Sequence, residues 1–178
     1  MTIIETPRLL LRLSTPETYK EVMEHYSPDA IKQFLGLATD NALEEARDKY
    51  KRHLTNYRSS FAYFHMIEKG TGRIMGDCSY HTWYFLHDRA EIGYSLRDDH
   101  DKNKGYMTEA IREVLRYGFG PMNLNRVEAF ISPDNIPSQK LVRAMGFTEE
   151  GRLREHYRKQ DRIEDSLVFG LLRKEFKP

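Results

Sequence analysis

The hydrophobic positions in the first third of the chain predict a short strand followed by three helices. Residues 8–13 form an apolar run that suits a buried strand. A helix then opens at a proline and covers 16–26, and a second helical stretch covers 28–36. Asp40 and Asn41 can cap a third, longer helix. Its apolar positions recur every three or four residues, at Leu43, Ala46, Tyr50, Leu54 and Tyr57.

In the remainder of the chain, strands and helices alternate. Aromatic and β-branched residues mark three strands, with a Gly-Thr-Gly turn between the first two, at 61–67, 74–84 and 89–96. The elements after them are a helix at 105–118, a strand at 126–131, a helix at 135–145, and two strands within 147–172 around a turn at 159–162. This order predicts an α+β domain with a mostly antiparallel sheet, in which the helix at 105–118 joins two parallel neighbouring strands.

Composition narrows the class of protein. The length of 178 residues suits a single domain over 1–178. Lys and Arg number 28 and Asp and Glu 27, so the net charge of +1 argues against a nucleic-acid partner. No apolar run approaches the roughly 20 residues of a membrane span, so no membrane partner is expected. Cys78 is the only cysteine, which excludes an intrachain disulfide and favours a cytoplasmic location.

The segment that follows the strand at 89–96 has the features of a phosphate cradle. Gly105 stands at the opening of a helix, where free backbone N–H groups and the helix dipole attract an anion. Lys102 and Lys104 would strengthen this attraction. Three nearby carboxylates would repel a phosphate unless they point away, namely those of Asp98, Asp99 and Asp101. By itself, the segment also fits a charged turn that only caps a helix.

The whole arrangement resembles the GNAT family, the acetyl-CoA-dependent N-acetyltransferases. That family's phosphate loop reads Gln/Arg-x-x-Gly-x-Gly/Ala at a strand-to-helix junction. Here the motif falls on Lys102, Asn103, Lys104, Gly105, Tyr106 and Met107, with Gly105 as the one identity. The substitutions leave amide donation in place, because the loop acts through backbone N–H groups.

Four blocks in order make the resemblance closest to the Rim-type branch, the ribosomal-protein N-terminal acetyltransferases and their relatives. Residues 6–12 resemble that branch's opening strand, and 105–110 its phosphate loop and helix start. Residues 132–147 resemble its Asn-x-x-Ser plus Gly-Phe block, while 150–157 and 165–172 resemble its closing hairpin. The resemblance implies a GNAT-like fold, a mixed and mostly antiparallel central sheet with splayed middle strands and helices on both faces.

The resemblance also implies where acetyl-CoA binds. In this family the pantetheine arm pairs with the strand before the phosphate loop, between diverging strands, which places it along Ile92, Tyr94 and Leu96. The loop amides then neutralise the pyrophosphate. Asn135 and Ser138 carry over from the Asn-x-x-Ser pattern to the cofactor side of the site.

Acetyl transfer to an amine needs a base for the amine and a proton for the leaving thiolate. Glu91 is the candidate base, since protein-acetylating GNAT members place a glutamate on the strand leading into the loop. The alternative is a strand glutamate that is solvated or paired with Arg89 or Arg97. Many GNAT enzymes carry a tyrosine acid where this chain has Val142, so the resemblance to the Rim-type branch moves the acid role to Ser138.

Four further side chains are candidates for lining the acceptor pocket: His81, Trp83, Tyr84 and Tyr157. Aromatic residues on half-buried strands also serve packing alone, and that alternative stays open for each. The seven histidines show no His-x-x-x-His spacing on an expected helix, so no metal site is expected.

The expected activity is direct acetyl transfer to a primary amine, with a protein or peptide N-terminus, such as that of a ribosomal protein, as the favoured acceptor. At pH 7 an α-amine is roughly 14% neutral and a lysine-like amine only about 0.04%, so the α-amine needs less help from a general base to lose its proton. Polyamines and amine-bearing antibiotics remain alternatives. So does a non-catalytic module that only binds acyl-CoA. Related proteins often dimerise, which leaves a homodimer open.

Overall fold

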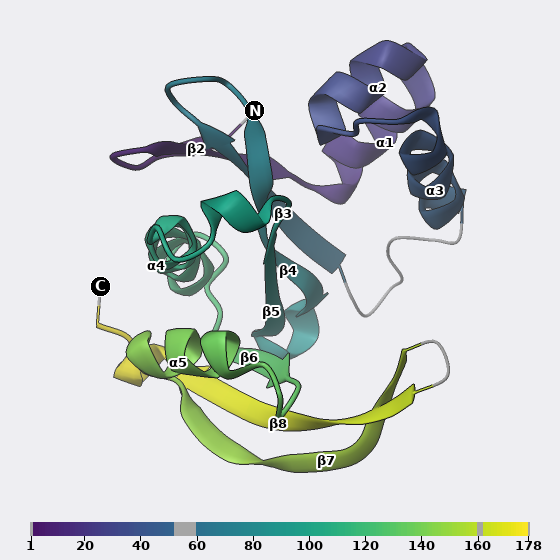
Figure 1. Cartoon of the computed structure of the whole chain (residues 1–178). Helices are drawn as coiled ribbons and strands as arrows, with labels where there is room; N and C mark the ends of the chain where they lie inside the picture. The colour runs from purple at the N-terminus through teal and green to yellow at the C-terminus, as the bar shows by residue number, and fades with distance from the viewer. Residues whose placement is uncertain (1, 52–59, 160–161, 178) are drawn as a thin grey trace.

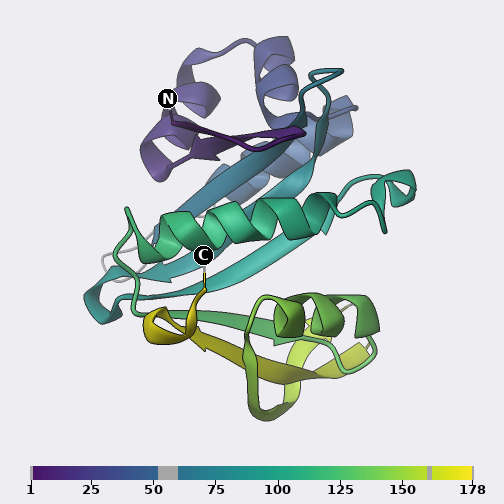
Figure 2. The same cartoon turned by 90° about the vertical axis from the view of Figure 1, so that its left-hand side faces the viewer.

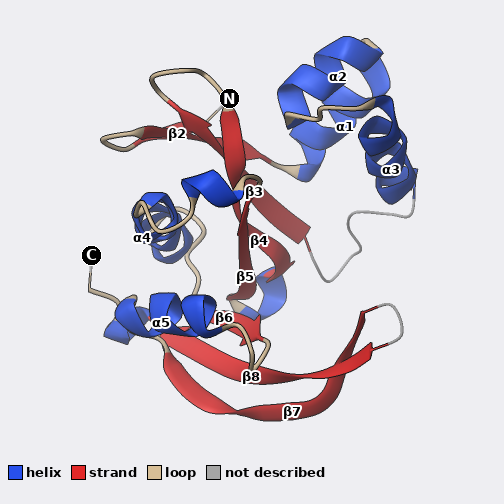
Figure 3. Ribbon diagram, viewed as in Figure 1, coloured by secondary structure: helices blue, strands red, loops and turns tan. Residues whose placement is uncertain are grey.

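The computed structural model describes residues 2–51, 60–159 and 162–177, which form five α-helices and one eight-stranded sheet (Figures 1 and 3). The helices are α1 (Pro16–His25), α2 (Pro28–Leu35), α3 (Asp40–Lys51), α4 (Tyr106–Phe119) and α5 (Ile136–Ala144). The strands are β1 (Ile3–Glu5), β2 (Leu9–Ser14), β3 (Ser60–Glu68), β4 (Ile74–Tyr84), β5 (Arg89–Leu96), β6 (Arg126–Ile131), β7 (Thr148–Lys159) and β8 (Arg162–Leu172). Their spatial order is β1-β2-β3-β4-β5-β6-β8-β7.

Helices cover both faces of the sheet. Figure 1 shows α4 on one side of β3–β5 and the α1–α3 group on the other, and Figure 2 shows α4 lying across its face of the sheet. The core under α4 takes alternate side chains from the strands, such as Leu11 and Phe64, both fully buried. Tyr80 of β4 fixes the helix in place, because its hydroxyl donates to the Val114 carbonyl at 2.9 Å. Gly118 leaves room for that hydroxyl, which a Cβ would meet at 2.1 Å.

The middle of the sheet opens where its one parallel pair diverges. β5 and β6 stay in register only over 89–91 and 126–128, although both strands continue beyond these residues. On its other side β5 stays paired with β4, and the Arg97 N–H donates to the Met75 carbonyl at 2.9 Å. Backbone groups alternate in direction along an antiparallel strand. Those of Ile92, Tyr94 and Leu96 therefore point toward the gap between β5 and β6.

The observed elements confirm most of the sequence predictions. The strands expected at 74–84, 89–96 and 126–131 have those bounds, and the expected α+β class, splayed strands and helices on both faces are all present. The third helix is described to Lys51, so its expected continuation through Leu54 and Tyr57 lies outside the described residues. Part of the turn expected at 159–162 also lies outside them. The three-residue strand β1 was not predicted.

None of the described helices has the length and apolar character needed to cross a membrane.

The sheet face under α1–α3 carries a row of polar side chains, one from each of four neighbouring strands. The register places Arg12 of β2 beside His65 of β3, His65 beside Asp77 of β4, and Asp77 beside Ser95 of β5. His65 is 7% exposed, and neither ring nitrogen has a hydrogen-bond partner among the described residues. Burial lowers the pKa of His65 to about 4, helped by the positive charges of Arg12 and Arg97.

This buried histidine predicts a loss of stability in mild acid. An unfolded histidine has a pKa near 6.5, so between pH 6.5 and 4 the unfolded chain binds more protons than the folded one. Stability is therefore present above pH 6.5 and lost as the pH falls toward 4, with His65 contributing up to about 3 kcal/mol of the loss. Urea unfolding between pH 4 and 8 measures this dependence.

The matched variants are His65→Phe and His25→Phe, since His25 is exposed at the end of α1. His65→Phe should flatten the fall in unfolding free energy below pH 6.5, and His25→Phe should leave it as in the wild type. A wild-type slope in His65→Phe would show that protonation of His65 is not the cause.

Candidate active site

The loop between β5 and α4 presents a set of free backbone donors. Asn103 and Gly105 adopt left-handed conformations, with φ of 60° and 79°. The N–H groups of residues 103–108 donate no hydrogen bond to any described backbone or side-chain acceptor. They lie at the N-terminus of a fourteen-residue helix, whose dipole favours negative charge. This loop can therefore bind a phosphate group through its main chain.

The three aspartates of this loop are all engaged by other groups. Asp101 is 5% exposed and receives a bidentate pair of hydrogen bonds from Arg73, at 2.8 and 3.0 Å, which holds the pKa of the carboxyl below its usual value. Asp99 pairs with the Lys102 ammonium at 2.5 Å. Asp98 accepts the His100 N–H at 2.9 Å. The carboxylates would repel a bound phosphate unless they point away from it, and the pairing with Arg73 meets this condition for Asp101.

A contact with the first strands anchors the start of α4. Glu109 accepts hydrogen bonds from the Thr6 hydroxyl at 2.5 Å and from the Arg8 N–H and Nε at 2.9 and 2.7 Å. Burial raises the pKa of Glu109, but these hydrogen bonds outweigh it and the net pKa is lowered. Arg8 also donates to the Lys104 carbonyl and lies 4.2 Å from the Tyr106 ring centroid. The loop is therefore fastened from one side, which preorganises its amides.

The diverging strand β5 and the start of α5 meet across the gap. The Tyr94 hydroxyl points to the Ser138 carbonyl, at 3.5 Å, and burial raises the pKa of that tyrosine. Asn135 caps α5, since its Oδ1 accepts the Ser138 N–H at 3.2 Å. The Ser138 hydroxyl donates no hydrogen bond to a described residue. The Asn-x-x-Ser pattern therefore forms a helix cap that leaves one hydroxyl available beside the gap.

Glu91, the predicted base, meets two of the predicted acceptor-lining residues. Its Oε1 lies 2.9 Å from Nε2 of His81 and 3.4 Å from the Tyr157 hydroxyl, which donates to it. The three side chains come from β5, β4 and β7. The Glu91 side chain is 15% exposed. Burial and the charge of Glu91 raise the pKa of Tyr157, so its hydroxyl keeps its proton at neutral pH.

An irregularity in β4 brings His81 to Glu91. The register passes from Tyr80 opposite Ile92 to Thr82 opposite Glu91, which makes His81 an extra residue in the strand. Its ring lies over Gly93, where a Cβ would meet Nδ1 at 2.8 Å. The bulge and the glycine together direct the imidazole along the sheet to the carboxylate.

A second carboxylate stands next to Glu91, and it is occupied. The parallel register places Glu128 of β6 beside Glu91. Glu128 accepts hydrogen bonds from Nη1 of Arg89 at 2.6 Å and from Nε of Arg126 at 2.8 Å. Arg89 therefore pairs with Glu128, while Arg97 donates to backbone carbonyls at the end of α2. Neither arginine takes Glu91 as its partner, which removes one alternative interpretation of that residue.

The other two predicted acceptor-lining residues lie elsewhere. Trp83 packs against the core under α4 and stands edge-on to Phe85, with 6.5 Å between ring centroids. Tyr84 lies under the Arg89 guanidinium, at 4.1 Å. Within 2–51, 60–159 and 162–177, no group of three His, Cys, Asp or Glu side chains is placed to hold a metal ion.

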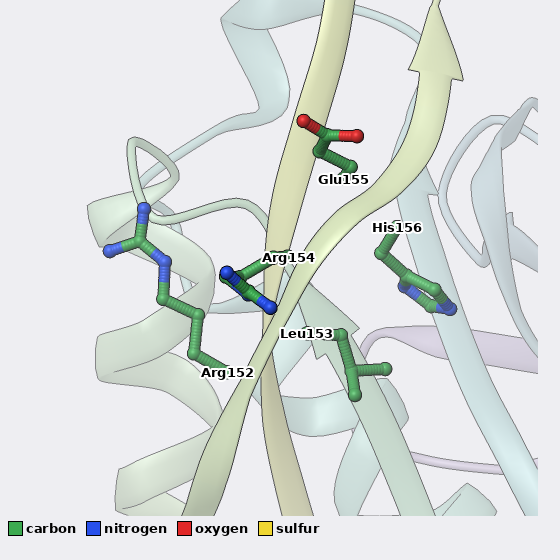
Figure 4. A pocket seen from close by; sticks show the side chains of 5 residues that line it. All are labelled: Arg152, Leu153, Arg154, Glu155 and His156. Carbon is green, nitrogen blue, oxygen red and sulfur yellow. The ribbon is translucent and has the colours of Figure 1, made fainter.

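A hollow of about 660 Å³ lies at the bend of β7, lined by Arg152, Leu153, Arg154, Glu155 and His156 (Figure 4). The pairing of β7 with β8 shifts register between Leu153 and Tyr157, and Glu155 takes a positive φ of 53°. Nδ1 of His156 lies 3.0 Å from the Ser166 hydroxyl, and its ring is 4.4 Å from that of Tyr157. The bend thus holds Tyr157 where it reaches Glu91, a contact that sequence spacing does not show.

The chain belongs to the GNAT acetyltransferase family, since residues 8–148 match the model of the acetyltransferase (GNAT) domain. It is 31% identical over 177 residues to the uncharacterized N-acetyltransferase p20 of Bacillus licheniformis, covering 99% of each chain. It is 29% identical over 133 residues to YdaF of Bacillus subtilis, provisionally named a ribosomal N-acetyltransferase, covering 72% of each. The solved dodecameric structure of spermidine N-acetyltransferase from Vibrio cholerae has the same fold, with a TM-score of 0.69, 18% identity, and coverage of 95% and 96%.

The family and the N-acetyltransferase class predicted from the sequence blocks are thereby confirmed, and the relation to YdaF agrees with the ribosomal-protein branch. GNAT acetyltransferases use acetyl-CoA. The six free amides and the unpaired edge of β5 suit its pyrophosphate and its amide-containing arm. The roles of the individual residues stay predictions.

Proposed function

We propose that this enzyme transfers the acetyl group of acetyl-CoA directly to the α-amine of a protein or peptide N-terminus. The observation that carries the proposal is the position of Glu91. Its carboxylate meets His81 and Tyr157 at the last residue where β5 and β6 remain paired, next to the opening that leads to the phosphate loop. A partly exposed carboxylate with a histidine partner can accept a proton from an amine.

The cofactor would lie along one continuous surface. Bound acetyl-CoA supplies the acetyl group as a thioester. The backbone groups of Ile92, Tyr94 and Leu96 would pair with its arm, and the amides of the loop at 102–107 would hold its pyrophosphate. Tyr106 and Met107 pack against the core, so they would contribute main chain rather than side chain.

The two proton transfers fall to different residues. Glu91 would accept the proton that the acceptor amine loses as its new bond to carbon forms, directly or through one water. His81 would share with Glu91 the positive charge of the transferred proton, because its Nε2 contacts the same carboxylate oxygen. As the carbon–sulfur bond breaks, the Ser138 hydroxyl at the start of α5 would pass its proton to the leaving thiolate and regain one from water, so that no alkoxide remains. In this proposal the base comes from β5 and the acid from the start of α5.

The α-amine is the favoured acceptor for two reasons. It is roughly 14% neutral at pH 7, against about 0.04% for a lysine-like amine. In addition, the other carboxylate beside Glu91 is already paired with Arg89 and Arg126, so it is not free to bind a polycation. The name of YdaF agrees with this class of acceptor.

A polyamine is the second candidate acceptor, supported by the shared fold of the spermidine enzyme. The deciding experiment follows CoA release with a panel of amide-capped peptides, spermidine and aminoglycosides. We expect peptides with a free α-amine to have the highest kcat/KM, and acetylation of their N-terminus by mass spectrometry. A preference for spermidine would overturn the proposal that the acceptor is an α-amine. If acetyl-CoA bound but no amine caused CoA release, the chain would be a non-catalytic module that binds acyl-CoA.

Ser138→Ala should lower kcat more than it raises the KM for acetyl-CoA, since a proton donor acts in the transition state. Steady-state kinetics at saturating acceptor separates the two parameters. Asn135→Ala is the comparison: it removes the cap of the same helix, which should cost about 1 kcal/mol of stability, and from its place on the cofactor side it should raise the KM for acetyl-CoA rather than lower kcat. A Ser138→Ala effect confined to KM would leave Ser138 as a cofactor contact only.

A further inference from the structure

A cavity of about 330 Å³ lies between the α1–α3 helices and the sheet, on the same face as Glu91. Its apolar wall comes from the helical segment, and its floor comes from β3 and β4 and from Arg97, which follows β5. The lining residues are Tyr19, Leu35, Leu37, Ala42, Glu45, Ala46, Lys49, Tyr63, His65, Asp77 and Arg97. The volume lies at the lower end of the range for small-ligand pockets.

A covered and unused hydrogen-bonding group borders the cavity. His65 is more than nine-tenths buried and lines the cavity, and neither ring nitrogen has a partner among the described residues. The two neighbouring arginines are committed elsewhere. Nη2 of Arg12 donates to the Phe34 carbonyl, and Nη2 of Arg97 donates to the Leu35 carbonyl at 2.5 Å. A buried, unpartnered imidazole costs free energy unless a ligand satisfies it.

The charges around the cavity cancel. Asp77 and Glu45 contribute two negative charges, and Arg97 and Lys49 contribute two positive ones. His65 is neutral at pH 7, with a pKa of about 4, and so offers one donor and one acceptor. A charged ligand group would find no excess of opposite charge here. A neutral group with both hydrogen-bond functions, such as an amide, fits this lining.

The cavity lies along the strands from the Glu91 site. Asp77 and His81 are four residues apart on β4, which corresponds to about 13 Å along a strand. Ser79 and Gly93 face each other between them, and the His81 ring covers Gly93, so a bound peptide would pass over that ring. An extended peptide advances about 3.3 to 3.6 Å per residue, so its third to fourth residue would reach the cavity when its amine meets Glu91.

We propose that this cavity is a specificity pocket that receives a neutral, amide-bearing side chain three to four residues after the acceptor amine. This inference rests on the proposed function, because it takes the acceptor to be a peptide acetylated at Glu91. It adds which part of the acceptor the enzyme recognises at a distance from the reacting amine.

The test compares kcat/KM for amide-capped alanine peptides of one to four residues and for tetrapeptides that end in Gln, Lys, Glu or Leu. We expect the Gln tetrapeptide to exceed alanine amide by at least tenfold, mainly through a lower KM, and to exceed the Lys and Glu tetrapeptides by a similar factor. In His65→Phe the ratio of the Gln tetrapeptide to alanine amide should fall to within about twofold of one. His25→Phe should keep the wild-type ratio.

Acetylation that is independent of peptide length, or that favours the Lys or Glu peptide, would overturn the specificity pocket and leave the proposed function standing. An unchanged ratio in His65→Phe would do the same. Absence of acetylation of every peptide and of alanine amide would instead overturn the proposed function itself. Melting temperatures of both variants at pH 7.5 check that they are folded.

Discussion

Glu91→Gln should lower kcat by roughly 10²- to 10⁴-fold with the true acceptor. The amide keeps the size of the side chain and its contacts with His81 and Tyr157, but it cannot accept a proton. The loss should shrink as the pH rises from 6 to 9, because an acceptor that loses its proton to bulk water needs less help. Steady-state kinetics over this pH range provides the measurement, and acetyl-CoA affinity should stay within about twofold.

Glu128→Gln is the matched control, since this carboxylate lies beside Glu91 on the same sheet face and is held by Arg89 and Arg126. It should cost stability and less than tenfold in kcat, without the same pH trend. If Glu91→Gln kept the wild-type kcat from pH 6 to 9, Glu91 would be a structural strand residue.

Gly105→Glu should weaken acetyl-CoA binding by at least about 100-fold. The substitution places a carboxylate among the free amides of residues 103–108, where it competes with the pyrophosphate and repels it. The φ of 79° at this position also disfavours any residue with a Cβ, by roughly 1–2 kcal/mol. Calorimetric titration of the folded variant with acetyl-CoA measures the affinity.

Gly72→Glu separates these two effects. Gly72 has a φ of 70°, lies in the turn between β3 and β4, and a Cβ there would have open space around it. The control should lose similar stability and bind acetyl-CoA as the wild type does. Unchanged affinity in Gly105→Glu would show that the phosphate loop is assigned to the wrong segment.

The parts of the structure that follow from local pattern were predictable. The strands at 74–84 and 89–96 were found with their bounds, because alternating apolar residues end at glycine-rich or polar turns. Glu91 could be singled out because it precedes a loop with a recognisable glycine. The strand β1 escaped prediction, since three residues give no usable alternation and its pairing with β2 is what makes it a strand.

The contacts that shape the site depend on distant pairings. The meeting of His81 with Glu91 requires the bulge in β4, and the reach of Tyr157 requires the bend in β7. The neutralisation of Glu128 joins residues from two strands that only the helical crossover makes neighbours. No local pattern encodes these three-dimensional juxtapositions. Similarly, the unpartnered state of His65 results from the way α2 uses the nearby arginines.

The most direct test of catalysis at this site is a single-turnover reaction of the full chain. The substrates are acetyl-CoA with an isotopic carbon label in its acetyl group and a tetrapeptide amide with a free N-terminus. We expect the label on the peptide N-terminal nitrogen, no labelled protein at any time point, and at least a 100-fold slower transfer in Glu91→Gln. Label that stays on acetyl-CoA, although calorimetry shows that it binds, would contradict the assignment of this chain as a direct N-terminal acetyltransferase.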